Sequence, residues 1–317
     1  MLALVFDGKA TLRTDYPKPT PQRGEALVAV RVAGVCSTDL EVLKGYMGFR
    51  GVMGHEFVGE VVEGPGKWRG KRVVAEINCP CGQCDMCRSG LSNHCRNRTV
   101  VGISGRDGAF AEMLAVPVGT LHEVPPQVSD DQAVFVEPLA AAYQVVRQVR
   151  FQRSDDVVVL GDGRLGQLVA RVLRPLLRKV VMVGKHPAKL ETAEKQGIET
   201  VTLDRYVARA SADVVIEATG RPAGLELAMR AVRPRGTIIL KSTAASAEPI
   251  NLSPVVVNEV TMIGSRCGPF GDALRALAGG GVDIFGLISR RFPLTRATEA
   301  LEAAERPENM KVLIDVR

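Results

Sequence analysis

Residues 157–166 read Val157-Val-Val-Leu-Gly161-Asp-Gly163-Arg-Leu-Gly166, and this stretch decides the fold. The pattern G-x-G-x-x-G follows an apolar run and opens a helical segment, which is the context that the motif requires. Its glycines allow a tight turn close to a pyrophosphate, and the unpaired N–H groups of the next helix face the phosphates. A plain structural turn is the alternative. The dinucleotide interpretation predicts these cofactor-binding residues: Gly161, Gly163, Arg164, Leu165 and Gly166.

Strands and helices alternate around this turn. The sequence predicts strands over 155–160, 179–183, 213–217 and 236–240, and helices over 137–149, 165–177, 188–196 and 222–232. Such alternation favours an α/β fold with a parallel, doubly wound sheet. The first 120 or so residues are instead predicted to be β-rich, since they consist of short apolar runs that Gly and Pro interrupt. The end of the chain adds helices near 270–279 and 295–306 and a strand over 311–316.

The strand after the turn ends in Gly184-Lys185-His186, at the position that discriminates between nicotinamide cofactors. A site for NAD normally places Asp or Glu here to hold the ribose 2′-hydroxyl. Gly184 lacks that carboxylate, Lys185 adds a cation where a 2′-phosphate would lie, and Lys189 follows one helical turn later. The sequence therefore favours NADP(H) over NAD(H). In the alternative interpretation both lysines are ordinary solvated side chains, and NAD binds without a carboxylate.

The composition excludes several classes of protein. The chain has 317 residues, 46% apolar and 24% charged, which suits one large or two ordinary globular domains. No run approaches the roughly 18 uninterrupted apolar residues of a transmembrane helix, so we expect no membrane partner. Residues 1–8 lack the features of a signal peptide, which makes the cytoplasm the expected location.

The formal net charge is +6 and the isoelectric point is near 9.0. The basic residues are dispersed, as in Arg147, Arg150, Arg171 and Arg174, at spacings that indicate solvated helix faces. We therefore expect no nucleic-acid partner, and an anionic small molecule fits this modest excess better.

Five of the seven cysteines fall between Cys79 and Cys95, which indicates a metal site rather than a disulfide framework. Four of them form the pattern C-x2-C-x2-C-x7-C: Cys81, Cys84, Cys87 and Cys95. Four thiolates close a tetrahedral zinc shell and leave no position for substrate, so this site is structural. Free cysteines and an iron–sulfur cluster are the alternatives. Cys79 has no place in the shell and is interpreted as a bystander.

Further motifs connect these features: Gly34-Val-Cys36-Ser-Thr-Asp39, Gly54-His-Glu56 and Glu137-Pro-Leu. In their order and spacing, together with the cysteines and the dinucleotide turn, they resemble the medium-chain zinc-dependent alcohol and polyol dehydrogenases, of the sorbitol and threonine dehydrogenase branch. The resemblance covers essentially the whole chain. It implies a GroES-like β-barrel catalytic domain, 1–137 plus 264–317, with the structural zinc lobe at 79–95, and a Rossmann domain at 138–263.

The resemblance also implies a catalytic zinc held by Cys36, His55, Glu56 and Glu137. One thiolate, one imidazole and one or two carboxylates are compatible with a site that keeps a position open for substrate. The sequence alone also allows another interpretation, in which Glu137 only marks the start of a helix, with Pro at the first helical position.

Two neighbours of Cys36 take roles from the same resemblance. Asp39 resembles the acid that orients the histidine ligand, and Thr38 resembles the hydroxyl that takes the alcohol's proton. Many relatives carry a histidine in the next turn where this chain has Glu41, so the route of the proton to solvent is left open. Cys267 has two interpretations, a neighbour of the nicotinamide or a packing residue.

The expected activity is hydride transfer between an alcohol or polyol and NADP(H), with two zinc ions per chain, in a homodimer or homotetramer. Two other classes stay open. One is a catalytically silent relative that binds NADP(H) as a sensor or structural protein, and the other is a zinc protein that binds nucleic acid.

Overall fold

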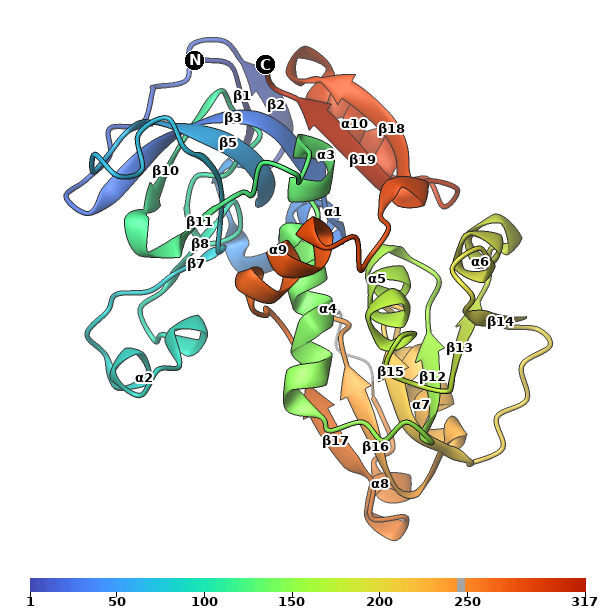
Figure 1. The fold of residues 1–317 in the computed structure, drawn as a ribbon. Helices are drawn as coiled ribbons and strands as arrows, with labels where there is room; N and C mark the ends of the chain where they lie inside the picture. The colour runs from blue at the N-terminus through green and yellow to red at the C-terminus, as the bar shows by residue number, and fades with distance from the viewer. Residues whose placement is uncertain (244–248) are drawn as a thin grey trace. The chain divides into compact units, whose positions relative to one another are not determined.

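The computed structural model describes residues 1–243 and 249–317, and within these the chain folds into two compact units (Figure 1). The first unit comprises Met1–Glu137 and Phe270–Arg317, and the second comprises Pro138–Pro269. Among the described residues, no helix is both long enough and apolar enough to cross a membrane.

The second unit is built on a six-stranded sheet in which neighbouring strands run parallel, as predicted. Its strands, in spatial order, are β14 (Glu199–Thr202), β13 (Lys179–Gly184), β12 (Asp156–Leu160), β15 (Ala212–Glu217), β16 (Val232–Leu240) and β17 (Thr261–Gly264). Its helices are α4 (Val136–Gln148), which starts in the first unit, α5 (Arg164–Leu173), α6 (Pro187–Glu194), α7 (Pro222–Ala231) and α8 (Ser253–Val257). The chain order reverses between β12 and β15, so ligands of such a sheet bind beyond the carboxyl ends of these two strands.

Helix α5 differs from its prediction in two ways. It ends at Leu173 rather than at residue 177, because Pro175 has no N–H to donate to the carbonyl oxygen of Arg171 and so cannot continue the helix. Residues 166–173 are all buried, which includes Arg171 at 4% exposure. The expectation that Arg171 lies on a solvated face is therefore wrong, since a helix buried on all sides leaves no such face.

The segment between β17 and α9 (Phe270–Ala278) belongs by its contacts to the second unit, whereas the predicted Rossmann domain ends at residue 263. Lys241, which follows β16, donates to Ser265 Oγ at 3.1 Å, to the carbonyl oxygen of Arg266 at 3.1 Å and to that of Ala141 at 2.8 Å. This buried ammonium ties the segment to the parallel sheet and to α4.

The first unit is mostly antiparallel and confirms the GroES-like expectation. Its principal sheet has the order β11-β6-β5-β3-β19-β18, with β10 also paired to β3. Its strands are β1 (Ala3–Phe6), β2 (Ala10–Arg13), β3 (Glu25–Val35), β4 (Gly51–Val52), β5 (Glu56–Glu63), β6 (Arg72–Ala75), β7 (Asn78–Cys79), β8 (Thr99–Val101), β9 (Gly105–Arg106), β10 (Met113–Pro117), β11 (Leu121–Glu123), β18 (Ile288–Pro293) and β19 (Lys311–Asp315). Its other helices are α1 (Ser37–Leu43), α2 (Asp85–Arg88), α3 (Asp130–Ala133), α9 and α10 (Ala297–Glu305).

Strand β3 is the centre of this unit, because it pairs with β5, β10 and β19. Nearly all of its residues are buried, which explains its almost continuous run of Val, Ala and Leu. Its register against β5 shifts at two places, and such irregularities bend a strand and increase its twist. The strand has three partners because β5 takes one edge, while β10 pairs with residues 25–29 and β19 with residues 32–35 along the other.

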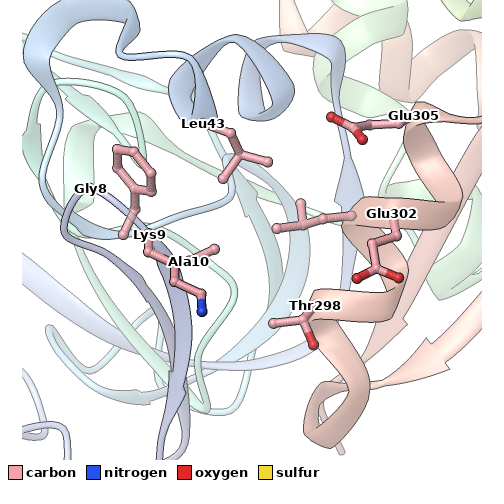
Figure 2. A pocket seen from close by; sticks show the side chains of 9 residues that line it. Gly8, Lys9, Ala10, Leu43, Thr298, Glu302 and Glu305 are labelled. Carbon is pink, nitrogen blue, oxygen red and sulfur yellow. The ribbon is translucent and has the colours of Figure 1, made fainter.

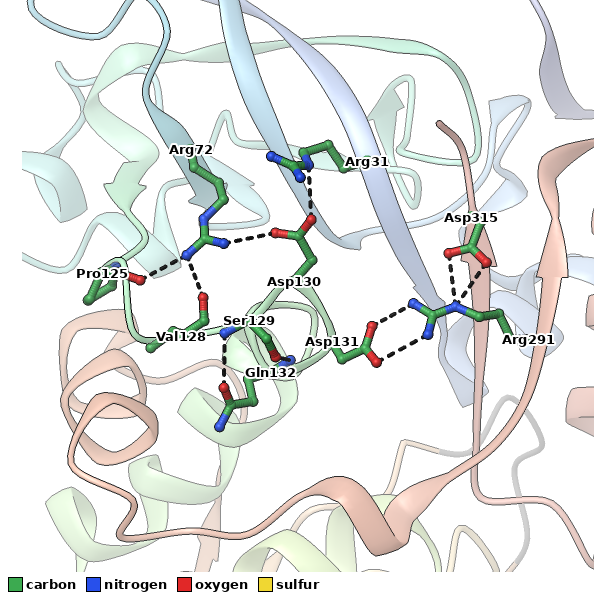
Figure 3. A network of polar contacts seen from close by, with 10 residues as sticks. All are labelled: Arg31, Arg72, Pro125, Val128, Ser129, Asp130, Asp131, Gln132, Arg291 and Asp315. Atoms are coloured by element: carbon green, nitrogen blue, oxygen red, sulfur yellow. Dashed lines mark hydrogen bonds and ion pairs between the residues drawn. The ribbon is translucent and has the colours of Figure 1, made fainter.

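A network of ion pairs holds helix α3 against the sheet of the first unit (Figure 3). Asp130 lies 2.9 Å from Arg31 of β3 and 3.2 Å from Arg72 of β6. Asp131 contacts Arg291 of β18, and this pairing contributes to a raised pKa of that guanidinium. Because α3 leads directly into α4, the network fixes the point at which the chain enters that helix.

Candidate active site and metal centres

Four cysteines of the first unit converge around helix α2. The four Sγ atoms lie within 4.8 Å of one another and belong to Cys81, Cys84, Cys87 and Cys95. Their distances are 3.5 Å for Cys84–Cys87, 3.7 Å for Cys84–Cys95 and 3.5 Å for Cys81–Cys95. A tetrahedral zinc with Zn–S bonds of about 2.3 Å has sulfur–sulfur edges of about 3.8 Å. The four sulfur atoms therefore fit a closed tetrahedral zinc site.

Backbone N–H groups favour thiolates in this cluster. The amides of Cys87 and Arg96 donate to Cys84 and lower the pKa of its thiol to about 6. The amide of Gln83 is the largest cause of a lowered pKa at Cys81. Desolvation and the neighbouring sulfur atoms raise the pKa of Cys87 to about 12. Four thiolates together carry four negative charges, and a divalent cation bound by them would offset half of that charge.

A second group of metal-ligating side chains lies where α1 and β5 begin. Ligand atoms of Cys36, His55 and Glu56 lie within 4.8 Å of one another, and His55 and Glu56 are 3% and 1% exposed. Asp39 holds two of the three residues. Its Oδ2 accepts the backbone N–H of Cys36 at 2.8 Å, and its Oδ1 lies 3.2 Å from Nδ1 of His55. This contact leaves Nε2 of His55 for a metal ion.

The electrostatic surroundings of His55 also suit a cation. Burial opposes a charge on the imidazole, but the Asp39 carboxylate and the Cys36 thiol outweigh burial. They hold the pKa of His55 well above its ordinary value. A site that attracts a proton so strongly also attracts a metal ion.

Glu56 is paired with Lys311, a residue that no motif in the sequence indicates. The ammonium of Lys311, in β19, is fully buried and contacts Oε2 of Glu56. It also lies 3.5 Å from the carbonyl oxygen of Val35 and 5.5 Å from the centre of the Phe135 ring. No hydrogen bond from the described residues reaches the buried Oε1 of Glu56. One carboxylate oxygen is thus bound to a cation, and the other is available to a metal ion.

Gly34 provides the space for this pair. It faces Glu56 in the neighbouring strand β5, and Leu313 of β19 on its other side. A Cβ atom at Gly34 would lie 2.7 Å from Oε2 of Glu56 and 3.5 Å from Cδ of Lys311. A side chain at this position would therefore collide with the ion pair.

The structure places the other predicted residues as follows. Thr38 Oγ1 lies 3.8 Å from the sulfur of the three-residue group. Glu137 stands in the first turn of α4 and is not part of that group. Glu41 forms an ion pair with the lysine three residues after it. Among the described residues, Cys79 and Cys267 belong to neither metal-ligating group. The role of Glu137 as a ligand stays a prediction.

The dinucleotide turn joins β12 to α5 in the second unit. Gly161 has a φ of +113°, and a Cβ atom there would lie 2.6 Å from the carbonyl oxygen of Ala218, so only glycine fits. Helix α5 begins at Arg164 with Gly163 as its N-cap, followed by Leu165 and Gly166. N–H groups in the first turn of a helix have no partner within the helix, and this turn can therefore bind a pyrophosphate.

The predicted cofactor-discriminating residues differ in exposure. Lys185 is exposed directly after β13, whereas Lys189 in the first turn of α6 is buried at 8% exposure. The alternative that Lys189 is an ordinary solvated lysine is therefore wrong. Gly184 is packed against Asp162, since a Cβ atom there would lie 2.5 Å from that side chain.

A separate pocket of about 390 Å³ lies in the first unit between the β1–β2 turn and helix α10 (Figure 2). Apolar groups of Phe6, Leu43 and Leu301 line it, together with the carboxylates of Glu302 and Glu305. Its lining contains no residue of the two metal-ligating groups, so it is distinct from the candidate active site.

Comparisons with known proteins agree with this geometry. Residues 22–126 match the alcohol dehydrogenase GroES-like domain, and residues 165–279 match the zinc-binding dehydrogenase domain. The 2-dehydro-3-deoxy-L-galactonate 5-dehydrogenase of Pseudoalteromonas atlantica is 30% identical over 93% of this chain and 92% of that protein. The chain belongs to the zinc-dependent medium-chain alcohol and polyol dehydrogenases. This medium-chain dehydrogenase is an oxidoreductase that acts on CH–OH donors.

Two solved structures share the fold of this medium-chain dehydrogenase. A zinc-binding dehydrogenase from Sinorhizobium meliloti, bound to NADP, is 28% identical, with a TM-score of 0.90 and 99% of each chain covered. An alcohol dehydrogenase from Escherichia coli CFT073, complexed with NADH, is 25% identical, with a TM-score of 0.91 and coverage of 100% and 99%. Both forms of the nicotinamide cofactor are thus found in this fold.

The two metal-ligating groups should have separable effects. Cys81→Ser should lower the melting temperature and the zinc content together, because structural zinc binding is coupled to folding. Cys36→Ala should remove zinc from the other group with a much smaller loss of stability. Elemental analysis and thermal unfolding measure both effects. Cys79→Ser is the control, since Cys79 is close in sequence but outside the cluster, and a wild type with one zinc or fewer per chain contradicts the prediction.

The buried pair of Lys311 and Glu56 should be costly to break. Lys311→Met leaves the Glu56 carboxylate buried without its cation, so we expect a loss of about 3–5 kcal/mol in the metal-free protein, measured by urea unfolding. Glu56→Gln together with Lys311→Met should recover much of that loss. Lys44→Met removes an exposed ion pair and should have little effect. Equal losses for Lys311→Met and Lys44→Met would be incompatible with this argument.

Proposed function

We propose that this chain catalyses reversible hydride transfer between an alcohol or polyol and NADP(H) at the group formed by Cys36, His55 and Glu56. The observation that carries the proposal is the convergence of these three ligand types within 4.8 Å, in a buried position. Thiolate, imidazole and carboxylate form a donor set for zinc that leaves a position for substrate. The relatives are named as dehydrogenases, which favours an enzyme over a catalytically silent protein.

The protein's own residues prepare the site. When bound, zinc supplies Lewis acidity that acidifies an alcohol and polarises a carbonyl, and the nicotinamide accepts or returns the hydride. Asp39 fixes the orientation of His55, and Lys311 holds one oxygen of Glu56. Thr38, beside the sulfur of Cys36, would relay the alcohol's proton, because its hydroxyl can accept that proton while it passes its own proton on toward solvent. Glu137 serves as a further acidic ligand, direct or through water.

We assign a second, structural zinc to the four-cysteine cluster. Sulfur–sulfur distances of 3.5 to 3.7 Å support this assignment, as does the set of backbone amides that favours thiolates. An all-thiolate zinc cluster is typical of a reducing compartment, and we therefore retain the cytoplasm as the proposed location.

For the cofactor we propose NADP(H) in preference to NAD(H). Gly184 provides no carboxylate for the ribose 2′-hydroxyl, and the exposed Lys185 stands directly after β13 as a cation for a 2′-phosphate. Lys189 is buried in the first turn of α6, and its ammonium is the second candidate contact.

We also propose a homodimer or homotetramer formed through the second unit. Strand β17 is an edge strand of the parallel sheet, and the neighbouring segment exposes Leu252 at 52%, Val256 at 76% and Val257 at 78%. An open edge beside exposed apolar side chains is a surface that proteins normally cover, and a second copy of the same edge is its simplest partner.

A panel of alcohols, polyols and sugars, assayed with NADP and NAD separately, tests the activity and the cofactor together. Lys185→Ala should lower kcat/KM for NADP by about 10–100-fold, because it loses one charge-assisted hydrogen bond, and should leave NAD nearly unchanged. Lys179→Ala, at the opposite end of β13, is the matched control. A wild type that prefers NAD would contradict the cofactor assignment alone, whereas no turnover of any substrate would contradict the activity.

Glu137 is tested by Glu137→Gln, which keeps the side-chain shape and removes the charge. If the carboxylate acts on the metal ion, turnover or zinc affinity should fall by about 10–100-fold while the helix content is unchanged. Glu299→Gln, an acidic residue in the first turn of α10, is the control. If Glu137→Gln keeps the turnover and zinc affinity of the wild type, Glu137 is not a metal ligand and only marks the start of α4.

A further inference from the structure

Asp162, the residue between the first two glycines of the dinucleotide turn, reaches across to the end of the neighbouring strand β13. Its Oδ2 accepts the backbone N–H groups of Lys185 and His186, each at 2.7 Å. Both of its carboxylate oxygens also face Nδ1 of His186, at 3.0 and 3.1 Å. The Asp162 side chain is only 9% exposed. These contacts fix the position of the buried carboxylate within the turn.

The carboxylate occupies the space that Gly184 leaves. A Cβ atom at Gly184 would lie 2.5 Å from both Cβ and Oδ2 of Asp162. In sheets of this kind, a carboxylate at the end of the second strand reads the 2′-position of the adenosine ribose. Here the end of the second strand contributes no side chain, and the first turn places a carboxylate in the same region.

The contacts of Asp162 also use the donors that a phosphate would need. Backbone N–H groups at the start of a helix commonly bind anions. At the start of α6, Lys185 and His186 direct their N–H groups to Asp162, and Pro187 has none. A 2′-phosphate arriving here therefore meets a negative charge and two occupied donors, with the exposed ammonium of Lys185 as its attraction.

We propose that Asp162 is a specificity-determining residue of the cofactor site, which weakens binding of the 2′-phosphate and opposes the attraction by Lys185. This inference rests on the proposed use of a nicotinamide dinucleotide. The two residues act in opposite directions on the 2′-phosphate of NADP, and NAD has no 2′-phosphate for either of them to act on. The preference between the cofactors is thus a balance of opposing charges, the Asp162 carboxylate against the lysine ammonium groups, rather than the consequence of Lys185 alone.

The test replaces the charge and keeps the shape. Asp162→Asn retains one oxygen for the two backbone N–H groups, so the turn is preserved. We expect its dissociation constant for NADP to fall on the order of 10-fold relative to wild type, because a like charge has been removed from the binding site. The dissociation constant for NAD should change by less than about threefold. Both constants are measured by titration calorimetry without substrate.

Two fragments of the cofactor, one with and one without the 2′-phosphate, test the contact of Asp162 with that phosphate separately. Adenosine 2′,5′-bisphosphate should gain affinity in Asp162→Asn as NADP does, and 5′-AMP should not. Asp213→Asn is the matched control, because Asp213 also accepts a backbone N–H, from Asp156 at 2.8 Å, but lies where β15 begins rather than where it ends. Asp162→Ser, uncharged and with one acceptor, is the second variant.

The possible outcomes separate the two proposals. A wild type that binds neither NADP nor NAD overturns the proposed cofactor use. If the wild type binds them and neither Asp162→Asn nor Asp162→Ser binds NADP more tightly, this inference is overturned while the cofactor use stands. Weaker NAD binding with unchanged NADP binding in Asp162→Asn also overturns it, since the carboxylate would then hold a ribose hydroxyl.

Discussion

The buried ion pair of Glu56 and Lys311 is the constraint on which the candidate active site depends. The two residues are 255 positions apart and belong to β5 and β19, and the pair passes over Gly34 of β3, the strand between them. Removing either charge leaves the other in a fully buried position, which is far more costly than losing a surface pair. The metal-ligating group near the start of the chain is therefore tied to the last strand of the chain.

This constraint gives physical meaning to the short motif that contains Cys36. Gly34 must lack a side chain because the ion pair fills the space above it. Cys36 stands where β3 gives way to α1, and Asp39 in the first turn holds both the amide of Cys36 and the ring of His55. Cys36 at the start of α1, together with His55 and Glu56 at the start of β5, thus bring three ligands of different chemistry to one point.

Features set by local sequence were predictable. The glycine pattern after β12, the cysteine spacing around α2 and the parallel sheet all follow from short patterns whose geometry is nearly independent of the rest of the chain. The features that sequence reasoning missed depend on distant partners. Lys311 begins an apolar terminal strand, where a lysine is expected to be exposed at the end of the strand. Only its pairing with Glu56 explains its burial. The prediction for Arg171 is wrong for a related reason, since helical spacing does not reveal how many sides of α5 are covered.

Both candidate sites contain a glycine whose empty space is filled by a carboxylate from a neighbouring element. For this reason the residue at the end of a strand does not by itself show which charge lies there. At Gly34 and at Gly184 the glycine leaves a space, and a carboxylate from a neighbouring element fills it, Glu56 in one case and Asp162 in the other. Gly184 itself contributes no acidic side chain. The space beside it nevertheless holds a carboxylate, because Asp162 of the first turn fills it. Cofactor choice depends on the charge present beside the ribose, whichever strand supplies it. An assignment of NADP or NAD from the end of the second strand alone therefore holds only where the first turn contributes no charge of its own.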